Sequence, residues 1–183
     1  YWGANAASAD PAVREKAARI LARQIEAAHL LGIDTILAVP GTVGVDFIPG
    51  AEVVRYDVAH ERATEFLRAA LPAAEKAGVT IGVENVWNKF LLSPLEMRAF
   101  VDQFGSASVG VYFDVANTLA FGYPEHWIEI LGPRIKRVHF KDYRRNVATV
   151  DGFCDLLSGD VDWPSVMAAL RQVGYDGWVT AEM

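Results

Sequence analysis

The chain alternates between amphipathic helical segments and short apolar segments, and this alternation constrains its fold more than any other feature. Apolar residues recur at helical spacing over residues 10–31, where Asp10 can cap the helix and Gly32 can end it. The β-branched run over residues 35–39 then predicts a strand buried on both faces. A helix next to a buried strand is the repeating unit of an α/β protein.

The same pattern continues along the whole chain. The sequence predicts further helices over residues 57–77, 93–104, 124–131 and 164–173, and further strands over residues 80–84, 109–114, 135–140, 153–156 and 178–182. Gly78, Gly105 and Gly174 follow three of these helices, where glycine commonly ends a helix. Strict alternation predicts a parallel sheet covered by helices, and both an open doubly wound sheet and a closed barrel would satisfy it.

Polar side chains at the strand ends distinguish these two folds. Four predicted strands end in a carboxylate or an imidazole, namely Glu84, Asp114, His139 and Glu182. The carboxyl ends of parallel strands meet at one edge, where barrels assemble an active site from several strands. We therefore predict a (β/α)8 TIM barrel, an α/β fold, as a single domain over residues 1–183.

The length of the chain modifies this prediction. An eight-stranded barrel usually takes about 250 residues, whereas this chain has 183. Residues 1–3, Tyr-Trp-Gly, look like the exit of an earlier strand. We expect an incomplete barrel that lacks N-terminal β/α elements and the last helix, after Glu182. Open sheet edges favour self-association, so a homo-oligomer is an open alternative.

Composition and charge argue against several classes of protein. The net charge of −6 and the absence of a basic cluster longer than Arg144-Arg145 argue against nucleic-acid binding. No apolar run approaches the roughly 20 residues needed to cross a membrane. The single cysteine, Cys154, cannot form an internal disulfide, which favours the cytoplasm.

The four strand-end side chains have the chemistry of a metal site. Hard divalent cations such as Mn²⁺, Mg²⁺ or Co²⁺ bind carboxylate oxygens with an occasional imidazole, and keep positions open for substrate oxygens. A buried carboxylate without a partner is costly. Local backbone donors could satisfy each side chain singly, but the shared edge favours one divalent cation, with Mn²⁺ as the first choice.

Several motifs carry a resemblance to a known family. They are VENVWN at residues 83–88, FDVAN at 113–117, VHFKDY at 138–143, GDVDW at 159–163 and TAEM at 180–183. In this order they resemble the xylose isomerase-like barrel superfamily, and within it the sugar phosphate isomerases/epimerases and ketose 3-epimerases. The resemblance covers nearly the whole chain and implies a small sugar as substrate, without specifying which one.

The resemblance also implies roles for individual residues. Glu84 is similar to a glutamate that is both metal ligand and acid/base, and Glu182 is similar to its partner on the last strand. Asp114 and His139 match the two remaining ligands. Arg145, six residues beyond the histidine, matches an arginine that touches the substrate.

Further side chains are candidate substrate contacts with structural alternatives, and one of them, Asn117, could instead orient a metal ligand or form a turn. Trp87 follows the first glutamate closely and could stack on a sugar, although such aromatics are more often packing residues. Lys141 and Asp142 could reach the substrate or tie the loop that follows the strand, and a surface salt bridge is the structural alternative. Asn117 and Phe90 occupy positions where ketose 3-epimerases carry a histidine and a second glutamate, so these departures bear on substrate identity more than on reaction class.

These observations together predict an isomerase or epimerase of a small ketose, keto-sugar or sugar phosphate. A cation would stabilise the developing enediolate, while Glu84 and Glu182 exchange protons on opposite faces. Two alternatives stay open. One is a keto-inositol dehydratase of the same superfamily, and the other is a non-catalytic barrel remnant that binds metal or sugar.

Overall fold

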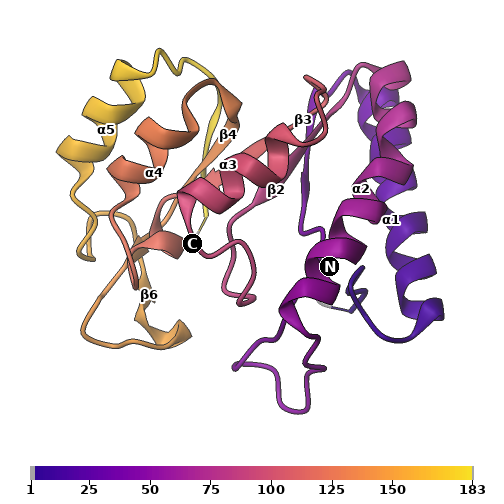
Figure 1. Cartoon of the computed structure of the whole chain (residues 1–183). Helices are drawn as coiled ribbons and strands as arrows, with labels where there is room; N and C mark the ends of the chain where they lie inside the picture. The colour runs from indigo at the N-terminus through magenta and orange to yellow at the C-terminus, as the bar shows by residue number, and fades with distance from the viewer. Residues whose placement is uncertain (1–2, 183) are drawn as a thin grey trace.

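The computed structural model describes residues 3–182 and has a curved sheet of five parallel strands, in the order β1-β2-β3-β4-β7 (Figure 1). The strands are β1 (Thr35–Ala38), β2 (Thr80–Glu84), β3 (Val109–Asp114), β4 (Ile135–Phe140) and β7 (Val179–Ala181). Tyr1, Trp2 and Met183 lie outside the described residues, and with them most of the predicted exit of an earlier strand. The sheet matches an incomplete TIM barrel, as predicted.

Helices follow the sheet from one edge to the other (Figure 1). They are α1 (Pro11–Leu31), α2 (Tyr56–Ala77), α3 (Pro94–Asp102), α4 (Pro124–Leu131) and α5 (Trp163–Gln172), with short 3-10 turns η1 (Ala116–Thr118), η2 (Gly132–Arg134) and η3 (Val150–Gly152). A small antiparallel pair, β5 (Asp142–Tyr143) and β6 (Phe153–Cys154), lies apart from the main sheet. No described helix combines the length and apolar character needed to span a membrane.

The helix ends follow local sequence signals. Asp10 accepts a hydrogen bond from the backbone N–H of Ala12 at 2.8 Å, and Pro11 occupies the first helical position of α1. Gly32 ends the same helix with a φ of 70°, a backbone conformation that residues other than glycine rarely adopt. Ser93 caps α3 by accepting from the N–H of Glu96. These are the signals from which the sequence predicted the helices.

Two predictions about the strands, those over residues 35–39 and 153–156, need correction. The run over residues 35–39 is not buried on both faces, because β1 is an edge strand and its first three residues are only half-buried. β7 is the other edge strand and its three residues are exposed. The strand predicted over residues 153–156 shortens to β6, which pairs with β5 instead of joining the parallel sheet.

One ion pair crosses the concave face of the sheet. Arg137 in β4 pairs with Asp34, which lies directly before β1, although β2 and β3 separate these two strands. Gly82 and Gly110 are paired in register and leave room for neighbouring side chains, since a Cβ at Gly110 would lie 2.6 Å from the Lys136 side chain and a Cβ at Gly82 would lie 3.1 Å from the Tyr112 Cβ. The pair therefore links distant strands across the curve.

Candidate metal centre

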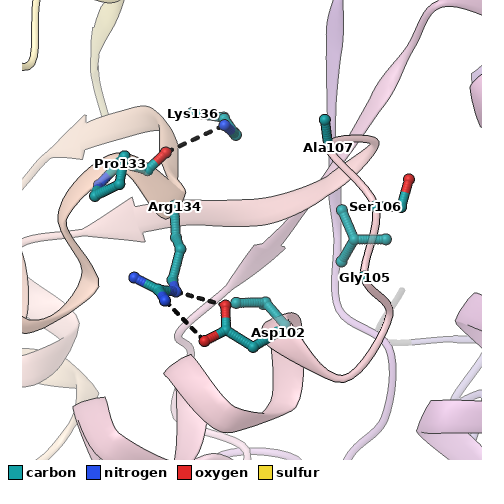
Figure 2. A pocket seen from close by; sticks show the side chains of 9 residues that line it. Asp102, Gly105, Ser106, Ala107, Pro133, Arg134 and Lys136 are labelled. Carbon is teal, nitrogen blue, oxygen red and sulfur yellow. Dashed lines mark hydrogen bonds and ion pairs between the residues drawn. The ribbon is translucent and has the colours of Figure 1, made fainter.

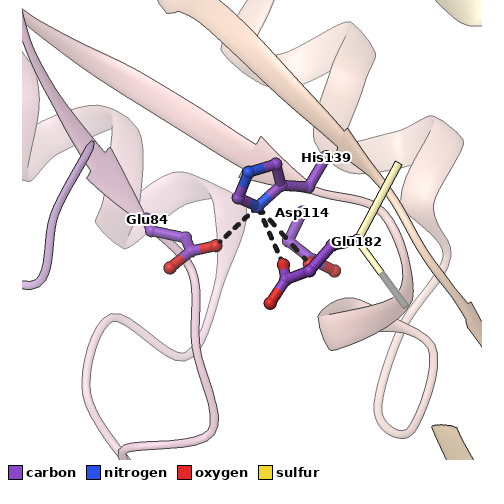
Figure 3. Close-up of side chains that lie close together, drawn as sticks. All are labelled: Glu84, Asp114, His139 and Glu182. Carbon is purple, nitrogen blue, oxygen red and sulfur yellow. Dashed lines mark hydrogen bonds and ion pairs between the residues drawn. The ribbon is translucent and has the colours of Figure 1, made fainter. Parts of the chain in front are cut away.

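Four side chains from four strands converge at the carboxyl edge of the sheet (Figure 3). Glu84 and Asp114 are the last residues of β2 and β3, and His139 lies beside Asp114 in the register of β3 and β4. Glu182 follows β7, where its backbone N–H donates to the Phe140 carbonyl at 2.9 Å. One ligand atom from each side chain lies within 4.8 Å of all the others.

The imidazole of His139 lies between the carboxylates. Its Nδ1 is 3.0 Å from Glu84 Oε1, 2.9 Å from Glu182 Oε2 and 4.0 Å from Asp114 Oδ2 (Figure 3). All four groups are acids or bases of the kind that coordinate cations. Three of the residues expose less than a tenth of their surface. The cluster is therefore compact and largely withdrawn from water.

Two carboxylate oxygens in this cluster are unsatisfied. Among the described residues, Asp114 Oδ2 and Glu182 Oε2 are buried and have no hydrogen-bond partner, since the short approach of Glu182 to His139 lacks hydrogen-bond geometry. Burying a carboxylate oxygen without a partner is costly. A divalent cation would compensate both oxygens, so the donor set fits a metal ion.

Electrostatics within the cluster shift two pKa values. Burial raises the pKa of Asp114 to about 8, with smaller contributions from the charges of Glu84 and Glu182, against the opposing effect of Lys141. For His139, burial lowers the pKa, but the hydrogen bond and charge of Glu84 and the other carboxylates outweigh it and leave the pKa raised. Both shifts express crowded negative charge in a buried place.

Two asparagines fix the position of Asp114. The Asn85 side chain donates to the Asp114 carbonyl at 2.8 Å and accepts from the Asp114 N–H at 2.9 Å. The backbone N–H of Asn117 donates to Asp114 Oδ1 at 2.7 Å, and its side chain donates to the Asn85 carbonyl at 2.9 Å. One carboxylate oxygen of Asp114 is therefore held by the protein, while Oδ2 faces the cluster.

The other residues predicted from the sequence differ in their contacts. Lys141 Nζ is 3.2 Å from Glu182 Oε1 and 4.4 Å above the Phe153 ring. Trp87 donates to the Asn117 carbonyl at 2.9 Å. Arg145 is exposed, with its guanidinium 5.4 Å from the Tyr123 ring centroid. Phe90 is buried in the core, between α2 and α3, so it does not line an open pocket.

One residue near the centre, Tyr112, was not singled out from the sequence, and a second, Asp142, has a structural role. The Tyr112 ring lies 4.5 Å from the His139 ring, and the period of two along a strand places Tyr112 on the same face as Asp114. Asp142 is fully buried and accepts from Tyr143 N, Val161 N and Trp163 Nε1. It ties the loop before α5 to β5, which is one of the two roles that the sequence left open for it.

A hollow of about 410 Å³ at the opposite edge of the sheet has a different character (Figure 2). Its Arg134 is held by Asp102 through two hydrogen bonds, of 2.6 and 2.8 Å, and Lys136 donates to the Pro133 carbonyl. The Arg134 contacts join η2 to the end of α3. Since both cations are already partnered, this hollow has a structural character.

Comparison with known proteins agrees with this arrangement. The family model described as xylose isomerase-like TIM barrel matches residues 1–183. The chain belongs to this family. The chain is also similar to an uncharacterized protein of Methanocaldococcus jannaschii, which is 26% identical over 184 residues, and to a putative L-ribulose-5-phosphate 3-epimerase of Escherichia coli, which is 29% identical over 188 residues.

The extent of these matches is also informative. The alignments cover 97% and 96% of this chain but 60% of each relative, so the chain spans about three fifths of the length of these relatives. The crystal structure of a D-tagatose 3-epimerase-like protein superposes with a TM-score of 0.83 at 23% identity, covering 99% of this chain and 67% of that chain. This structural likeness establishes a common xylose isomerase-like fold.

Proposed function

We propose that this protein is a divalent-metal-dependent enzyme that isomerises or epimerises a small ketose, keto-sugar or sugar phosphate through an enediolate. The observation that carries the proposal is the convergence of four ligand atoms within 4.8 Å, in a cluster where two buried carboxylate oxygens have no hydrogen-bond partner. Membership in the xylose isomerase-like family and similarity to a relative named as a putative L-ribulose-5-phosphate 3-epimerase support the reaction class.

The proposed cofactor is Mn²⁺, with Mg²⁺ and Co²⁺ as alternatives. Three carboxylates and one imidazole would hold it, namely Glu84, Asp114, His139 and Glu182. Oxygen-rich sites of this kind suit hard cations. When bound, such a cation stabilises negative charge that develops on substrate oxygens beside a carbonyl.

Glu84 and Glu182 are the proposed acid and base. They approach His139 from different sides, at 3.0 and 2.9 Å, so that a substrate between them would present opposite faces to the two carboxylates (Figure 3). One carboxylate removes the proton from the carbon beside the carbonyl. The other delivers a proton to the opposite face, which inverts the configuration at that carbon.

Four side chains outside the metal ligands are proposed substrate contacts: Trp87, Asn117, Lys141 and Arg145. Lys141 is the best supported, because its Nζ lies 3.2 Å from Glu182 Oε1 and its side chain is only slightly exposed.

The cytoplasmic location and the self-association of the chain stay predictions.

The test is metal-dependent exchange of a carbon-bound proton with D₂O across a panel of ketoses. We expect exchange with Mn²⁺ and none after chelation. Glu182→Gln should lower exchange by about 10²-fold or more, the scale of a lost general acid or base, while retaining most Mn²⁺ binding by calorimetry. The matched control is Glu125→Gln on α4, which should exchange like the wild type. Unchanged exchange in Glu182→Gln would remove this mechanism.

The same assay separates the alternatives. A non-catalytic remnant would bind Mn²⁺ and show a higher melting temperature with ketose, yet exchange no proton. A dehydratase would release water from a keto-inositol and form an unsaturated product, which mass spectrometry detects as the loss of one water. Either result would replace the proposed isomerase or epimerase.

A further inference from the structure

A cavity of about 490 Å³ opens among the loops that follow the strands of the sheet. The loops after β1, β2 and β3 contribute to it and leave the carboxyl edge that carries the metal centre, and the connection between β5 and β6 completes its wall. Its wall includes Asp46, Phe47, Trp87, Lys89, Phe121 and Thr149, with small and aliphatic side chains between them. Ligand pockets in proteins have volumes of this order.

Two chains of contacts connect the cavity wall to the metal centre. Trp87 donates to the Asn117 carbonyl at 2.9 Å, and the Asn117 N–H donates to Asp114 Oδ1 at 2.7 Å. On the other side, the Trp87 ring lies 5.2 Å from the Phe153 ring, over which Lys141 reaches towards Glu182. Trp87 in the cavity wall is therefore linked to the metal ligand Asp114 through one residue, Asn117.

The lining is aromatic and aliphatic with few polar groups. Phe47, Trp87 and Phe121 offer rings, and Phe121 is 56% exposed, so its ring is accessible to a ligand. Flat apolar rings pack against the C–H faces of sugars, and a few polar groups then fix the orientation. The cavity thus suits the carbon chain of a sugar.

The charges of the wall disfavour a phosphate. Lys89 is the cation among the described lining residues, and its Nζ lies 2.5 Å from Asp46 Oδ1. Both side chains are exposed, so the pair itself is weak. A phosphate drawn to Lys89 would nevertheless approach the negative charge of Asp46, whereas phosphate sites usually present uncompensated Arg or Lys groups.

The backbone around the cavity is also unusual. Lys89 and Ala148 line it from two different loops, and both have a φ of 58°, which non-glycine residues rarely adopt. Such conformations persist where the surrounding structure enforces them, and they concentrate at ligand sites. Both loops therefore hold strained residues at the cavity wall.

We propose that this cavity receives the non-reacting end of an unphosphorylated ketose or keto-sugar, and that the protein acts on neutral sugars in preference to their phosphates. The inference rests on the proposed function and narrows its substrate class. Aromatic rings bind the distal carbons, and Asp46 excludes a terminal phosphate.

The test compares ketoses with their own phosphates in the D₂O exchange assay with Mn²⁺-loaded protein. Suitable pairs are L-ribulose with L-ribulose 5-phosphate and D-fructose with D-fructose 6-phosphate. For the best pair we expect kcat/KM of the neutral sugar to exceed that of the phosphate by about 10-fold or more, the scale on which a pocket discriminates related substrates. A phosphate that exchanges as fast as its parent sugar would overturn the inference while leaving the proposed function intact.

Two variants test the cavity itself. Asp46→Asn should raise the use of the phosphate relative to the neutral sugar several-fold, and Asp155→Asn, an exposed carboxylate outside the lining with the same change in net charge, should not. Phe121→Ala should raise KM for the neutral sugar about 3- to 10-fold, the scale of one aromatic contact, with Mn²⁺ affinity unchanged. An unchanged KM in Phe121→Ala would show that the cavity does not hold the substrate.

The outcomes also separate this inference from the function beneath it. If no sugar of any pair exchanges its proton, the proposed function fails and the substrate class falls with it. If neutral sugars exchange and calorimetry shows that the phosphates bind equally well, the function stands and the cavity assignment is wrong.

Discussion

Asn117 helps to hold the ligand Asp114 through its backbone N–H and through its side chain. Its N–H donates to Asp114 Oδ1, and its side-chain amide donates to the carbonyl of Asn85, which in turn clamps the Asp114 backbone. Both asparagines are buried. From the sequence, Asn117 was a candidate both for contacting the substrate and for orienting a metal ligand, and these hydrogen bonds support the second role.

Replacement of Asn117 separates the two roles. Asn117→Ala leaves the buried Asn85 carbonyl without a donor and loosens the clamp, so we expect Mn²⁺ affinity to fall about 10-fold or more, measured by calorimetry. Asn88→Ala is the matched control, because buried Asn88 also donates to a backbone carbonyl but contacts no metal ligand. A higher KM for ketose with unchanged Mn²⁺ affinity would indicate a substrate contact alone.

The segment between β5 and α5 is organised around one buried carboxylate. Asp142 accepts hydrogen bonds from two backbone N–H groups and from the indole N–H of Trp163. Trp163 is the first residue of α5. Gly159 passes so close that a Cβ there would lie 2.2 Å from Asp142 Oδ1. The sequence motif at residues 159–163 is therefore the part of this connection that wraps around Asp142.

A methyl group at Gly159 should disturb this connection. Gly159→Ala forces Asp142 and the Tyr143 backbone to move, so we expect a loss of about 1–3 kcal/mol in the free energy of unfolding, as for other overpacked sites. Urea unfolding measures it. Gly44→Ala is the control, because a Cβ there would meet only Val53, at an ordinary 3.6 Å. Equal stability of the two variants would contradict the proposed packing.

At the scale of the whole molecule, the metal-free centre couples stability to pH. The pKa of Asp114 is raised to about 8 by burial, so the folded protein holds this proton more tightly than the unfolded chain. The contribution of Asp114 to stability is therefore lost as pH rises from about 4 to about 8. The pKa of His139 is raised too, and its contribution is lost in the same direction as pH passes its folded value.

We therefore expect the melting temperature in chelator to fall between pH 5 and pH 8. Mn²⁺ should raise it most at pH 8, since metal ligands bind in their deprotonated forms. Calorimetric scans at several pH values with and without Mn²⁺ measure both effects. Asp114→Asn removes the titrating carboxyl and should flatten the profile in chelator. Superimposable profiles of wild type and Asp114→Asn would contradict this account.

Much of this architecture was predictable because its signals are local. Helical periodicity, caps such as Asp10 and stops such as Gly32 act over one or two turns, and the structure confirms the helices that they predict. The strand ends were equally readable, since an apolar run that closes on a carboxylate marks one edge of a parallel sheet. The alternation and the family motifs together predicted the incomplete barrel.

The remaining features depend on which segments meet in space. The edge position of β1 depends on the order of the strands in the sheet. Two contacts join residues far apart in sequence, namely the ion pair between Arg137 and Asp34 and the hydrogen bonds of Asn85 to Asp114. No local periodicity encodes such meetings, because a side chain acquires its partners only when the sheet curves and the loops pack. Residue types and strand ends could thus be inferred from the chain, whereas burial, unsatisfied oxygens and the cavity came from the tertiary structure.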